Sequence, residues 1–247
     1  MLRTLRRAGL VWPTLATSVA LGVLLGLGSW QLDRKEWKEN LLARIGARVA
    51  ADPVPLAQIE ARAQAGEDVE YMHAAARGWF HHDKERYLYA PTSVGLAWHV
   101  FTPLQTGPGR IVWVNRGLVP DDRKAPSSRR AGLVMGEVEV RGLTRMTPAK
   151  SPFTPHNNVG GNLWYWADLP SMTASAFPGG SVAALPFVLE ADAEPLPPGG
   201  LPRGGVTRLA LPNRHLEYAL TWYGLALSLV AIYLAFAIPR LRASHRL

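Results

Sequence analysis

Two long uncharged runs near the ends of this chain constrain its fold more than any other feature of the sequence. Residues 8–32 and 218–239 contain no Asp, Glu, Lys or Arg, so the runs are 25 and 22 residues long. A helix rises about 1.5 Å per residue, which gives helices of roughly 37 and 33 Å. Either is long enough to cross a hydrocarbon layer of about 30 Å. The sequence therefore predicts two transmembrane helices.

Arginines flank the outer ends of both runs and predict how the chain is oriented. The formal net charge is +8, and six arginines account for most of it: Arg3, Arg6, Arg7, Arg240, Arg242 and Arg246. By the positive-inside rule, both termini are cytoplasmic and residues 33–217 are exported to the periplasm. The start at Met1 leaves no room for a transit peptide, so we expect a bacterial inner membrane.

The composition of the exported part excludes several classes of function. Residues 33–217 contain 21 Lys or Arg and 19 Asp or Glu, so they form no basic face for nucleic acid. The chain has no cysteine, which excludes disulfides, thiolate metal sites, iron-sulfur clusters and a cysteine nucleophile. We therefore expect the lipid bilayer and other proteins as partners, and no nucleic acid.

A cleaved signal peptide is the alternative interpretation of residues 8–32. Leu27-Gly28-Ser29 resembles a weak cleavage site, but the apolar run is long for a signal peptide. It also leads directly into Trp30-Gln31-Leu32-Asp33-Arg34, an aromatic and charged border that is typical of a retained helix. Small residues at four-residue spacing predict that the two transmembrane helices pack on each other: Ser18, Gly22 and Gly26 in the first, Gly224 and Ser228 in the second.

The exported residues are expected to form an α+β domain built on an antiparallel, barrel-like sheet. Residues 33–50 continue the first helix with an apolar stripe, and Asp52-Pro53 ends it. Short strands separated by turn residues follow, with one helix over Leu169–Phe177 that Asp168 caps. Residues 195–205, rich in Pro and Gly, are predicted to be an irregular linker back to the membrane. The strands are expected over residues 69–80, 86–90, 96–104, 110–119, 134–146, 163–167 and 184–191.

The predicted order is thus a cytoplasmic N-terminus (1–7), a transmembrane helix (8–32), the exported domain (33–217), a second transmembrane helix (218–239) and a cytoplasmic C-terminus (240–247). Common catalytic signatures such as GxSxG, HExxH and the P-loop are absent from it. His81-His82-Asp83 with Glu85 is the densest polar cluster. It is typical of a solvated turn between strands, and a metal site or a hydrolase centre there is the alternative.

His215 is the most informative of the seven histidines, because it lies three residues before the second uncharged run. A helical continuation of that run aligns His215 with Tyr218, Ala219 and Trp222 on one face. An imidazole beside aromatic rings at the membrane surface suits a flat apolar macrocycle that carries iron. An ordinary aromatic belt with a polar flank is the alternative interpretation.

Several segments, read in order, resemble the Surfeit locus protein 1 family of cytochrome c oxidase assembly factors. They are Leu27-Gly28-Ser29-Trp30-Gln31-Leu32-Asp33-Arg34, Val114-Asn115-Arg116-Gly117-Leu118-Val119-Pro120, Gly161-Asn162-Leu163-Trp164-Tyr165, and the segment from Asn213-Arg214-His215 to Trp222-Tyr223. Two departures are Arg214, where the family often has a second Asn, and Leu118, where an aromatic residue is common. From the residues alone, Gly117 indicates a turn, and Arg116 either pairs with an internal carboxylate or faces a partner.

The resemblance implies a protein that is not an enzyme and that binds haem a and delivers it to subunit I of the oxidase. In that family the histidine before the second transmembrane helix is associated with haem, and His215 occupies this position. Trp222 and Tyr223 would then stack on the haem, and Arg34 and Arg214 would bind its propionates. Haem A synthase and other assembly factors are further expected partners. The alternative within the family is a scaffold that assembles the oxidase without touching haem.

Overall fold

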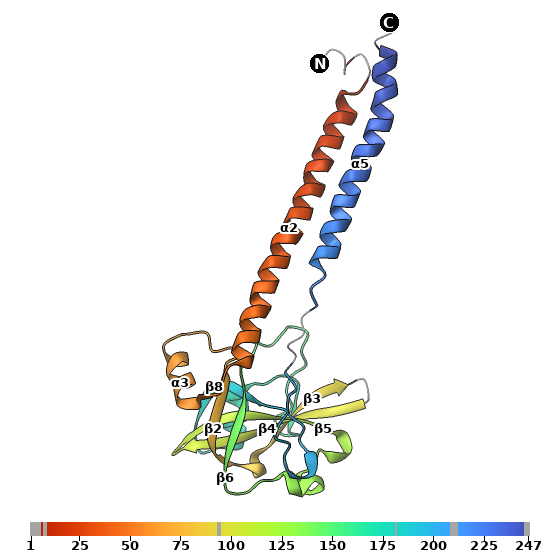
Figure 1. Ribbon diagram of the computed structural model, residues 1–247. Helices are drawn as coiled ribbons and strands as arrows, with labels where there is room; N and C mark the ends of the chain where they lie inside the picture. Colours follow the sequence, from red (N-terminus) through yellow and green to blue (C-terminus); the bar gives the residue numbers. More distant parts are fainter. Residues whose placement is uncertain (1–5, 7–8, 93–94, 181, 208–211, 245–247) are drawn as a thin grey trace. The chain divides into compact units, whose positions relative to one another are not determined.

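The computed structural model describes residue 6 and residues 9–92, 95–180, 182–207 and 212–244 (Figure 1). The predictions made for Arg3, Arg7 and Arg246 lie outside the described residues. The chain divides into two compact units. We call residues 1–44 with 210–247 the helix unit, and residues 45–209 the barrel domain.

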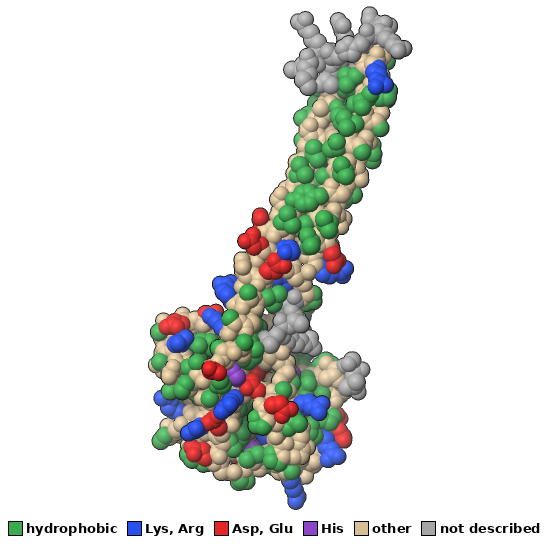
Figure 2. Space-filling model, in the orientation of Figure 1, with side chains coloured by type: hydrophobic (Ala, Val, Ile, Leu, Met, Phe, Trp, Pro, Cys, Tyr) green, Lys and Arg blue, Asp and Glu red, His purple; other side chains and the backbone are tan. Residues whose placement is uncertain are grey.

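The helix unit is built from two long apolar helices. Helix α2 is Val11–Ala50 and helix α5 is His215–Ser244. The most apolar window of each has a mean hydropathy of 1.6 and 1.9, yet only 6% and 11% of its residues are buried. Figure 2 shows the hydrophobic side chains that this leaves on the surface of the helices. Apolar helices with so little burial are not core helices of a soluble domain, and the predicted membrane protein with two terminal helices is confirmed.

The two helices contact each other, but not through the small residues that the sequence indicated. A Cβ atom added to Gly22, Gly26 or Gly224 would meet nothing within 4 Å. A Cβ at Gly28 would lie 2.6 Å from the ring of Tyr223, so this glycine provides the close approach. The prediction was wrong about the residues because four-residue spacing identifies a helix face without saying whether that face meets lipid or protein.

Two polar contacts at the ends of the pair show that the helices run antiparallel in the helix unit. Near the start of α2, the hydroxyl of Thr14 lies 2.5 Å from that of Tyr233. Near the other end, Lys38 donates a hydrogen bond to the carbonyl of Pro212. Helix α2 therefore lies beside α5 and the residues just before it from Thr14 to Lys38.

The barrel domain is a sheet that closes on itself. Five strands form the ring in the order β2-β6-β8-β5-β4, and β4 pairs again with β2. They are β2 (His73–Phe80), β4 (Gly95–Gly107), β5 (Arg110–Pro120), β6 (Glu137–Met146) and β8 (Ala183–Ala191). Short strands β1 (Val54–Pro55), β3 (Arg86–Thr92) and β7 (Leu163–Trp164) extend it. The predicted barrel-like sheet is confirmed.

The sheet is not antiparallel throughout, because β5 and β8 pair in parallel. So do β1 with β2 and β3 with β7. Parallel neighbours need a long connection between them. The chain from β5 to β8 provides one, and it contains β6, β7 and helix α4 (Leu169–Ala176). A five-stranded ring with one crossover of this kind belongs to the Greek-key barrels, among which are the OB-folds.

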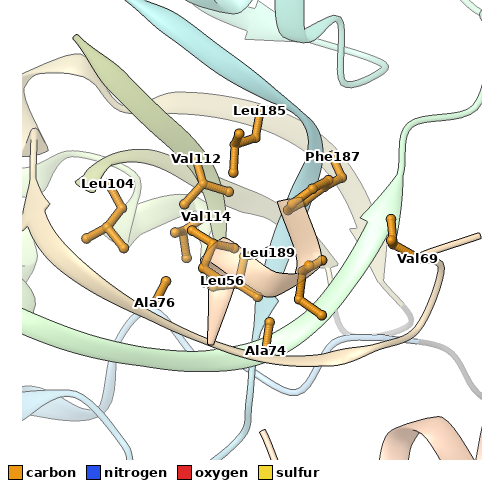
Figure 3. Packing of buried hydrophobic residues seen from close by; sticks show 11 residues of the cluster. Leu56, Val69, Ala74, Ala76, Leu104, Val112, Val114, Leu185, Phe187 and Leu189 are labelled. Carbon is orange, nitrogen blue, oxygen red and sulfur yellow. The ribbon is translucent and has the colours of Figure 1, made fainter. Parts of the chain in front are cut away.

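The alternation of side chains along β5 separates two apolar cores. Val112 and Val114 point into the barrel, where the largest cluster of buried residues lies (Figure 3). Ile111 and Trp113 point outward and pack under α4 in a second cluster. Helix α3 (Leu56–Gln64) inserts two fully apolar side chains, Leu56 and Ile59, into the first core. The sequence did not indicate this helix because it is only nine residues long and no side chain caps its start.

Local chemistry explains where the predicted elements begin and end. Asp168 caps α4, as predicted, by accepting hydrogen bonds from the amide and the hydroxyl of Ser171 at 3.2 and 2.7 Å. Helix α2 continues without a break through the predicted membrane boundary at Leu32 and ends at Ala50, just before Asp52-Pro53. The predicted stripe on its outer part is buried at Ile45, which is 9% exposed.

The Pro and Gly-rich segment 195–205 is fastened to the barrel. It contains the short helix η4 (Pro198–Gly200), and Leu118 and Arg203 exchange two backbone hydrogen bonds of 2.9 Å. Gly117 makes this pairing possible, because its φ is +110° and an added Cβ would lie 1.8 Å from the Arg203 carbonyl oxygen. The turn predicted at Gly117 is wrong, because β5 continues through it to Pro120 and its positive φ lies at an irregularity of the strand. The predicted irregular linker is in fact a packed part of the domain.

Candidate functional site

His215 is the first residue of α5, and its side chain is half-buried in the helix unit. Its Nδ1 atom lies 2.7 Å from Oε1 of Gln31 on α2. Within the described residues, no side chain or backbone group is hydrogen-bonded to the other ring nitrogen, Nε2. The imidazole is therefore held from one side, and its other nitrogen is engaged by no residue that the structure describes.

The aromatic residues predicted beside His215 lie further along the same helix. Trp222 and Tyr223 are both half-buried. The ring of Tyr223 packs against Gly28, and its hydroxyl lies 3.3 Å from the hydroxyl of Ser29. Tyr223 is thus a contact residue between α2 and α5, whereas Trp222 makes no hydrogen bond with any described residue.

The two arginines proposed for carboxylate binding are exposed and each contacts a protein group. Arg214 donates two hydrogen bonds, of 2.8 and 2.9 Å, to one oxygen of Glu217. These hydrogen bonds, together with the charge of Glu217, raise the pKa of the Arg214 guanidinium above its usual value. The guanidinium of Arg34 lies 4.0 Å above the ring of Trp37. Both arginines are cations at the same end of the helix unit as His215.

One buried acceptor near His215 lacks a donor. The Oδ1 atom of Asn213 is buried and forms no hydrogen bond with any described residue. Leaving a buried acceptor unsatisfied costs about 1–3 kcal/mol. An unsatisfied polar atom two residues from an imidazole with an unused nitrogen is typical of a site that a ligand completes.

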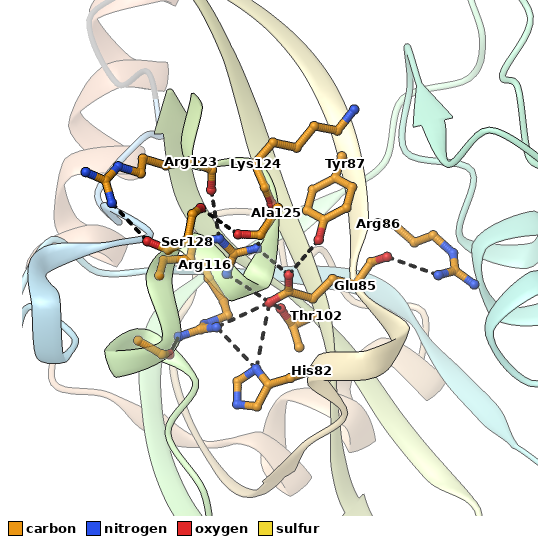
Figure 4. A network of polar contacts seen from close by, with 12 residues as sticks. His82, Glu85, Arg86, Tyr87, Thr102, Arg116, Arg123, Lys124, Ala125 and Ser128 are labelled. Carbon is orange, nitrogen blue, oxygen red and sulfur yellow. Dashed lines mark hydrogen bonds and ion pairs between the residues drawn. The ribbon is translucent and has the colours of Figure 1, made fainter. Parts of the chain in front are cut away.

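A second polar cluster lies inside the barrel domain, centred on Glu85 (Figure 4). Its side chain is 1% exposed, and Arg129 donates to both carboxylate oxygens. Arg116 lies 3.5 Å from Oε1, and the hydroxyl of Tyr87 donates at 3.0 Å. Of the two alternatives left open for Arg116, the structure shows the pairing with an internal carboxylate, and Glu85 is that carboxylate.

The charges of this network fix its protonation. Burial opposes ionisation of Glu85, but the contact with His82, whose Nδ1 lies 3.7 Å from Oε1, and the hydrogen bonds and charge of Arg129 outweigh it and lower its pKa from 4.5 to about 2. Burial also lowers the pKa of Arg116 to about 10, and the neighbouring charge of Arg129 adds to this, while Glu85 opposes it. Burial and the Glu85 charge raise the pKa of Tyr87. The Glu85 carboxylate and the Arg116 guanidinium are therefore charged at neutral pH.

The network is poorly suited to binding a ligand, because its arginine donors already have partners within the protein. Arg129 also donates to the carbonyls of Arg123 and Lys124, and Arg116 donates to that of Gly132. These acceptors belong to the short helices η2 (Asp121–Arg123) and η3 (Pro126–Gly132) and the residues between them. The network therefore fixes the loop between β5 and β6 onto the barrel.

The structure does not assemble the hydrolase centre considered from the sequence. His82 uses both ring nitrogens, with Val134 O at 2.9 Å and Arg116 at 3.4 Å. His81 contacts Gln105 at 2.9 Å, and Asp83 is exposed and pairs with Lys84 at 3.2 Å. The expected solvated turn is wrong for His82, whose side chain is 10% exposed. Among the described residues, no group of three His, Asp or Glu side chains is placed to hold a metal ion.

Two groups that matter in this geometry were not singled out from the sequence. Gln31 and Asn213 both belong to segments that carried the family resemblance, but neither had a role assigned to it. The available signal for Gln31 was its position as a strongly polar side chain at the end of an uncharged run. No signal connected it to a histidine 184 residues away in the chain.

Comparison with known proteins gives one consistent family. The SURF1 family matches residues 18–227. Surfeit locus protein 1 of Mus musculus is 38% identical over 216 residues, which are 81% of this chain and 67% of that protein. The protein of the same name from Homo sapiens is 38% identical over 218 residues, 81% of this chain and 69% of the relative. A SURF1-like protein of Monosiga brevicollis is 35% identical over 241 residues, 92% and 87% of the two chains.

Proposed function

The chain belongs to the SURF1 family, and on that premise we propose that it is an assembly factor of cytochrome c oxidase that binds haem a at His215. In this proposal the haem is cargo, which the chain receives in the membrane and passes to subunit I of the oxidase. Haem A synthase is the corresponding source. The chain lies in a bacterial inner membrane with both termini in the cytoplasm and the barrel domain in the periplasm.

The observation that carries the haem proposal is the unused Nε2 nitrogen of His215. Haem iron takes an imidazole nitrogen as an axial ligand, and it needs the lone pair of a neutral ring. His215 has one nitrogen engaged by Gln31 at 2.7 Å and the other without a partner among the described residues. Its half-buried position on α5 is a suitable environment for a ligand that is mostly apolar.

The surroundings of His215 fit the remaining parts of a haem. The unsatisfied Oδ1 of Asn213 favours a ligand with a hydrogen-bond donor. Trp222 supplies a half-buried aromatic surface two helical turns along the same face of α5, and Arg34 and Arg214 supply cations for propionates. Arg214 would exchange Glu217 for a propionate, which is a modest cost for an exposed ion pair.

The test is a visible spectrum of the full-length protein, purified in detergent from cells that also make haem a. We expect a haem band in the native protein and its loss in His215→Ala. A matched control is His156→Ala, because His156 is an exposed loop residue of the barrel domain whose ring contacts Lys150. This control should retain the band.

Each alternative result has a definite reading. Absence of haem from both the native protein and His215→Ala would overturn the haem proposal and leave the scaffold within the same family. A band that persists in His215→Ala would show that another residue is the axial ligand. Oxidase activity of cells carrying each variant connects the spectrum to assembly, since the proposal predicts loss of haem from subunit I with His215→Ala.

A further inference from the structure

We infer that Gln31 is a positioning residue, whose side chain holds His215 in the tautomer that keeps the Nε2 lone pair available. The inference rests on the proposed function in naming haem iron as the ligand. It goes further by assigning a role to a residue of the other transmembrane helix and by stating which ring nitrogen binds.

The direction of the hydrogen bond follows from the atoms. Nδ1 of His215 and Oε1 of Gln31 are 2.7 Å apart, a short distance for a hydrogen bond from nitrogen to oxygen. An amide oxygen has lone pairs and no proton, so it can only accept. His215 must therefore donate from Nδ1. A neutral imidazole has one N–H group, so a proton on Nδ1 leaves the lone pair on Nε2.

This arrangement is the one that metal-binding histidines use in proteins. The ring nitrogen that does not bind the metal donates its proton to a carboxylate, a carbonyl or water, and this contact sets both tautomer and ring orientation. The amide oxygen of Gln31 supplies such an acceptor. Without this acceptor, the proton can move to Nε2. The available lone pair is then on Nδ1, which faces α2, and Nε2 cannot bind the iron.

The packing of the two helices determines where Gln31 lies. Gly28 precedes it by one helical turn on the same face and makes the close contact with Tyr223. Thr14 at one end and Lys38 at the other are hydrogen-bonded to Tyr233 and Pro212 of the other segment. Several contacts thus keep the register of α2 and α5, so removal of the Gln31 amide should change the contact with His215 and leave the helix pair in place.

A purely structural role is the competing explanation, because polar side chains often join transmembrane helices. The Thr14–Tyr233 hydrogen bond separates the two explanations. It also joins α2 to α5, but it does not involve a histidine. Thr14→Val removes an interhelical hydrogen bond with almost no change in shape, and it is the matched control for Gln31→Leu.

The experiment measures the tautomer of His215 in the haem-free, full-length protein. Histidine is labelled with nitrogen-15, and the two ring-nitrogen signals of His215 are assigned by their loss in His215→Ala. At pH 8, above the ordinary pKa range of histidine, we expect a protonated Nδ1 and an unprotonated Nε2 in the native protein. Gln31→Leu should move the proton toward Nε2, whereas Gln31→Glu, which keeps an acceptor, and Thr14→Val should retain the native signals.

A haem titration of the same variants gives the functional readout. Loss of the partner of a ligating histidine lowers metal affinity about 10–100-fold, and we expect a loss of this size in Gln31→Leu. Gln31→Glu should restore binding. Helical content measured by circular dichroism checks that each variant is folded.

The outcomes for the two proposals are distinguishable. An unchanged His215 tautomer in Gln31→Leu would overturn the role of Gln31, whether or not haem binds. A native protein with the Nδ1-protonated tautomer that binds no haem would overturn the haem proposal and retain the positioning role. Equal losses of haem affinity in Gln31→Leu and Thr14→Val would favour general loosening of the helix pair and would also contradict the inference.

Discussion

Polar side chains away from the surface are more fully hydrogen-bonded in the barrel domain than in the helix unit. In the barrel domain, Glu85 is bound by Arg129 and Arg116, and the remaining donors of both arginines reach backbone carbonyls. In the helix unit, His215 has an unused nitrogen, and Asn213 Oδ1 is the buried side-chain atom that lacks a partner within the described residues. Residual hydrogen-bonding capacity therefore distinguishes the two regions: the polar groups around His215 retain it, whereas the network around Glu85 does not.

The largest effect is expected from removing the Glu85 carboxylate. Glu85→Ala leaves Arg116 and Arg129 buried without their counter-charge, which costs about 3–5 kcal/mol. At about 2–4 °C per kcal/mol for a domain of this size, the melting temperature of the barrel domain should fall on the order of 10 °C. Thermal unfolding followed by circular dichroism measures it.

Glu139→Gln is the control for this prediction. Glu139 also pairs with two arginines, Arg77 and Arg141, but on the surface. Exposed ion pairs contribute little to stability, so the melting temperature should hardly change. Similar losses in Glu85→Ala and Glu139→Gln would contradict the view that the buried network stabilises the domain.

Acid should remove the same contribution without a mutation. The pKa of Glu85 is lowered from 4.5 to about 2, so its stabilising effect is present above pH 4.5 and is lost as the pH falls toward 2. This shift in pKa corresponds to a contribution of about 3 kcal/mol to the free energy of unfolding at neutral pH. Melting temperatures between pH 7 and pH 2 should show a decline in this window that is shallower in Glu85→Gln. Identical pH profiles for the native protein and Glu85→Gln would contradict the assignment of this acid-dependent loss of stability to Glu85.

A smaller loss of stability is expected from Gly117→Ala, which alters the backbone of the barrel. The φ of +110° costs roughly 1–3 kcal/mol for a residue with a side chain. The added Cβ would also meet the Arg203 carbonyl, so the Leu118–Arg203 pairing must open. Limited proteolysis should cut segment 195–205 faster, and the melting temperature should fall.

Gly95→Ala separates the two causes. Gly95 has a φ of +131°, but an added Cβ would meet no described residue within 4 Å. It therefore carries the backbone strain without the collision. Gly117→Ala should be the more destabilised variant, and equal effects would mean that the contact with Arg203 contributes nothing.

The smallest effect is expected at Gly28 in the helix unit. Gly28→Ala places a methyl group 2.6 Å from the Tyr223 ring, and the half-buried ring can rotate away at a cost of about 1 kcal/mol. Spin labels on cysteines introduced at the exposed positions Val19 and Leu227 report the distance between the helices, because the chain has no other cysteine. Gly28→Ala should broaden or shift this distance, and Gly26→Ala should leave it unchanged.

The fold was predictable from the sequence wherever local rules decide it. The uncharged runs predicted α2 and α5. The turn residues on either side of β4 and β5 predicted the ends of both strands to within three residues. The parallel pairing of β5 with β8 was not predictable, because periodicity along a strand says nothing about its neighbours. The short helix α3 was missed for lack of a capping signal.

The site was predictable only in part for the same reason. Position in the chain singled out His215, since it lies just before an apolar run. Its contact with Gln31 depends on the register of two helices that are far apart in sequence, which no local pattern encodes. His82 and Glu85 were grouped correctly, but Arg116 and Arg129, which make them a structural network, come from other strands and loops.

The central claim is that the helix unit holds the binding site and the buried network of the barrel domain holds the fold. One paired measurement tests it: haem content and melting temperature of His215→Ala and Glu85→Gln in the full-length protein. We expect His215→Ala to lose haem with an unchanged melting temperature, and Glu85→Gln to melt lower while its folded fraction keeps haem. Haem retained by His215→Ala, or lost from folded Glu85→Gln, would contradict the claim.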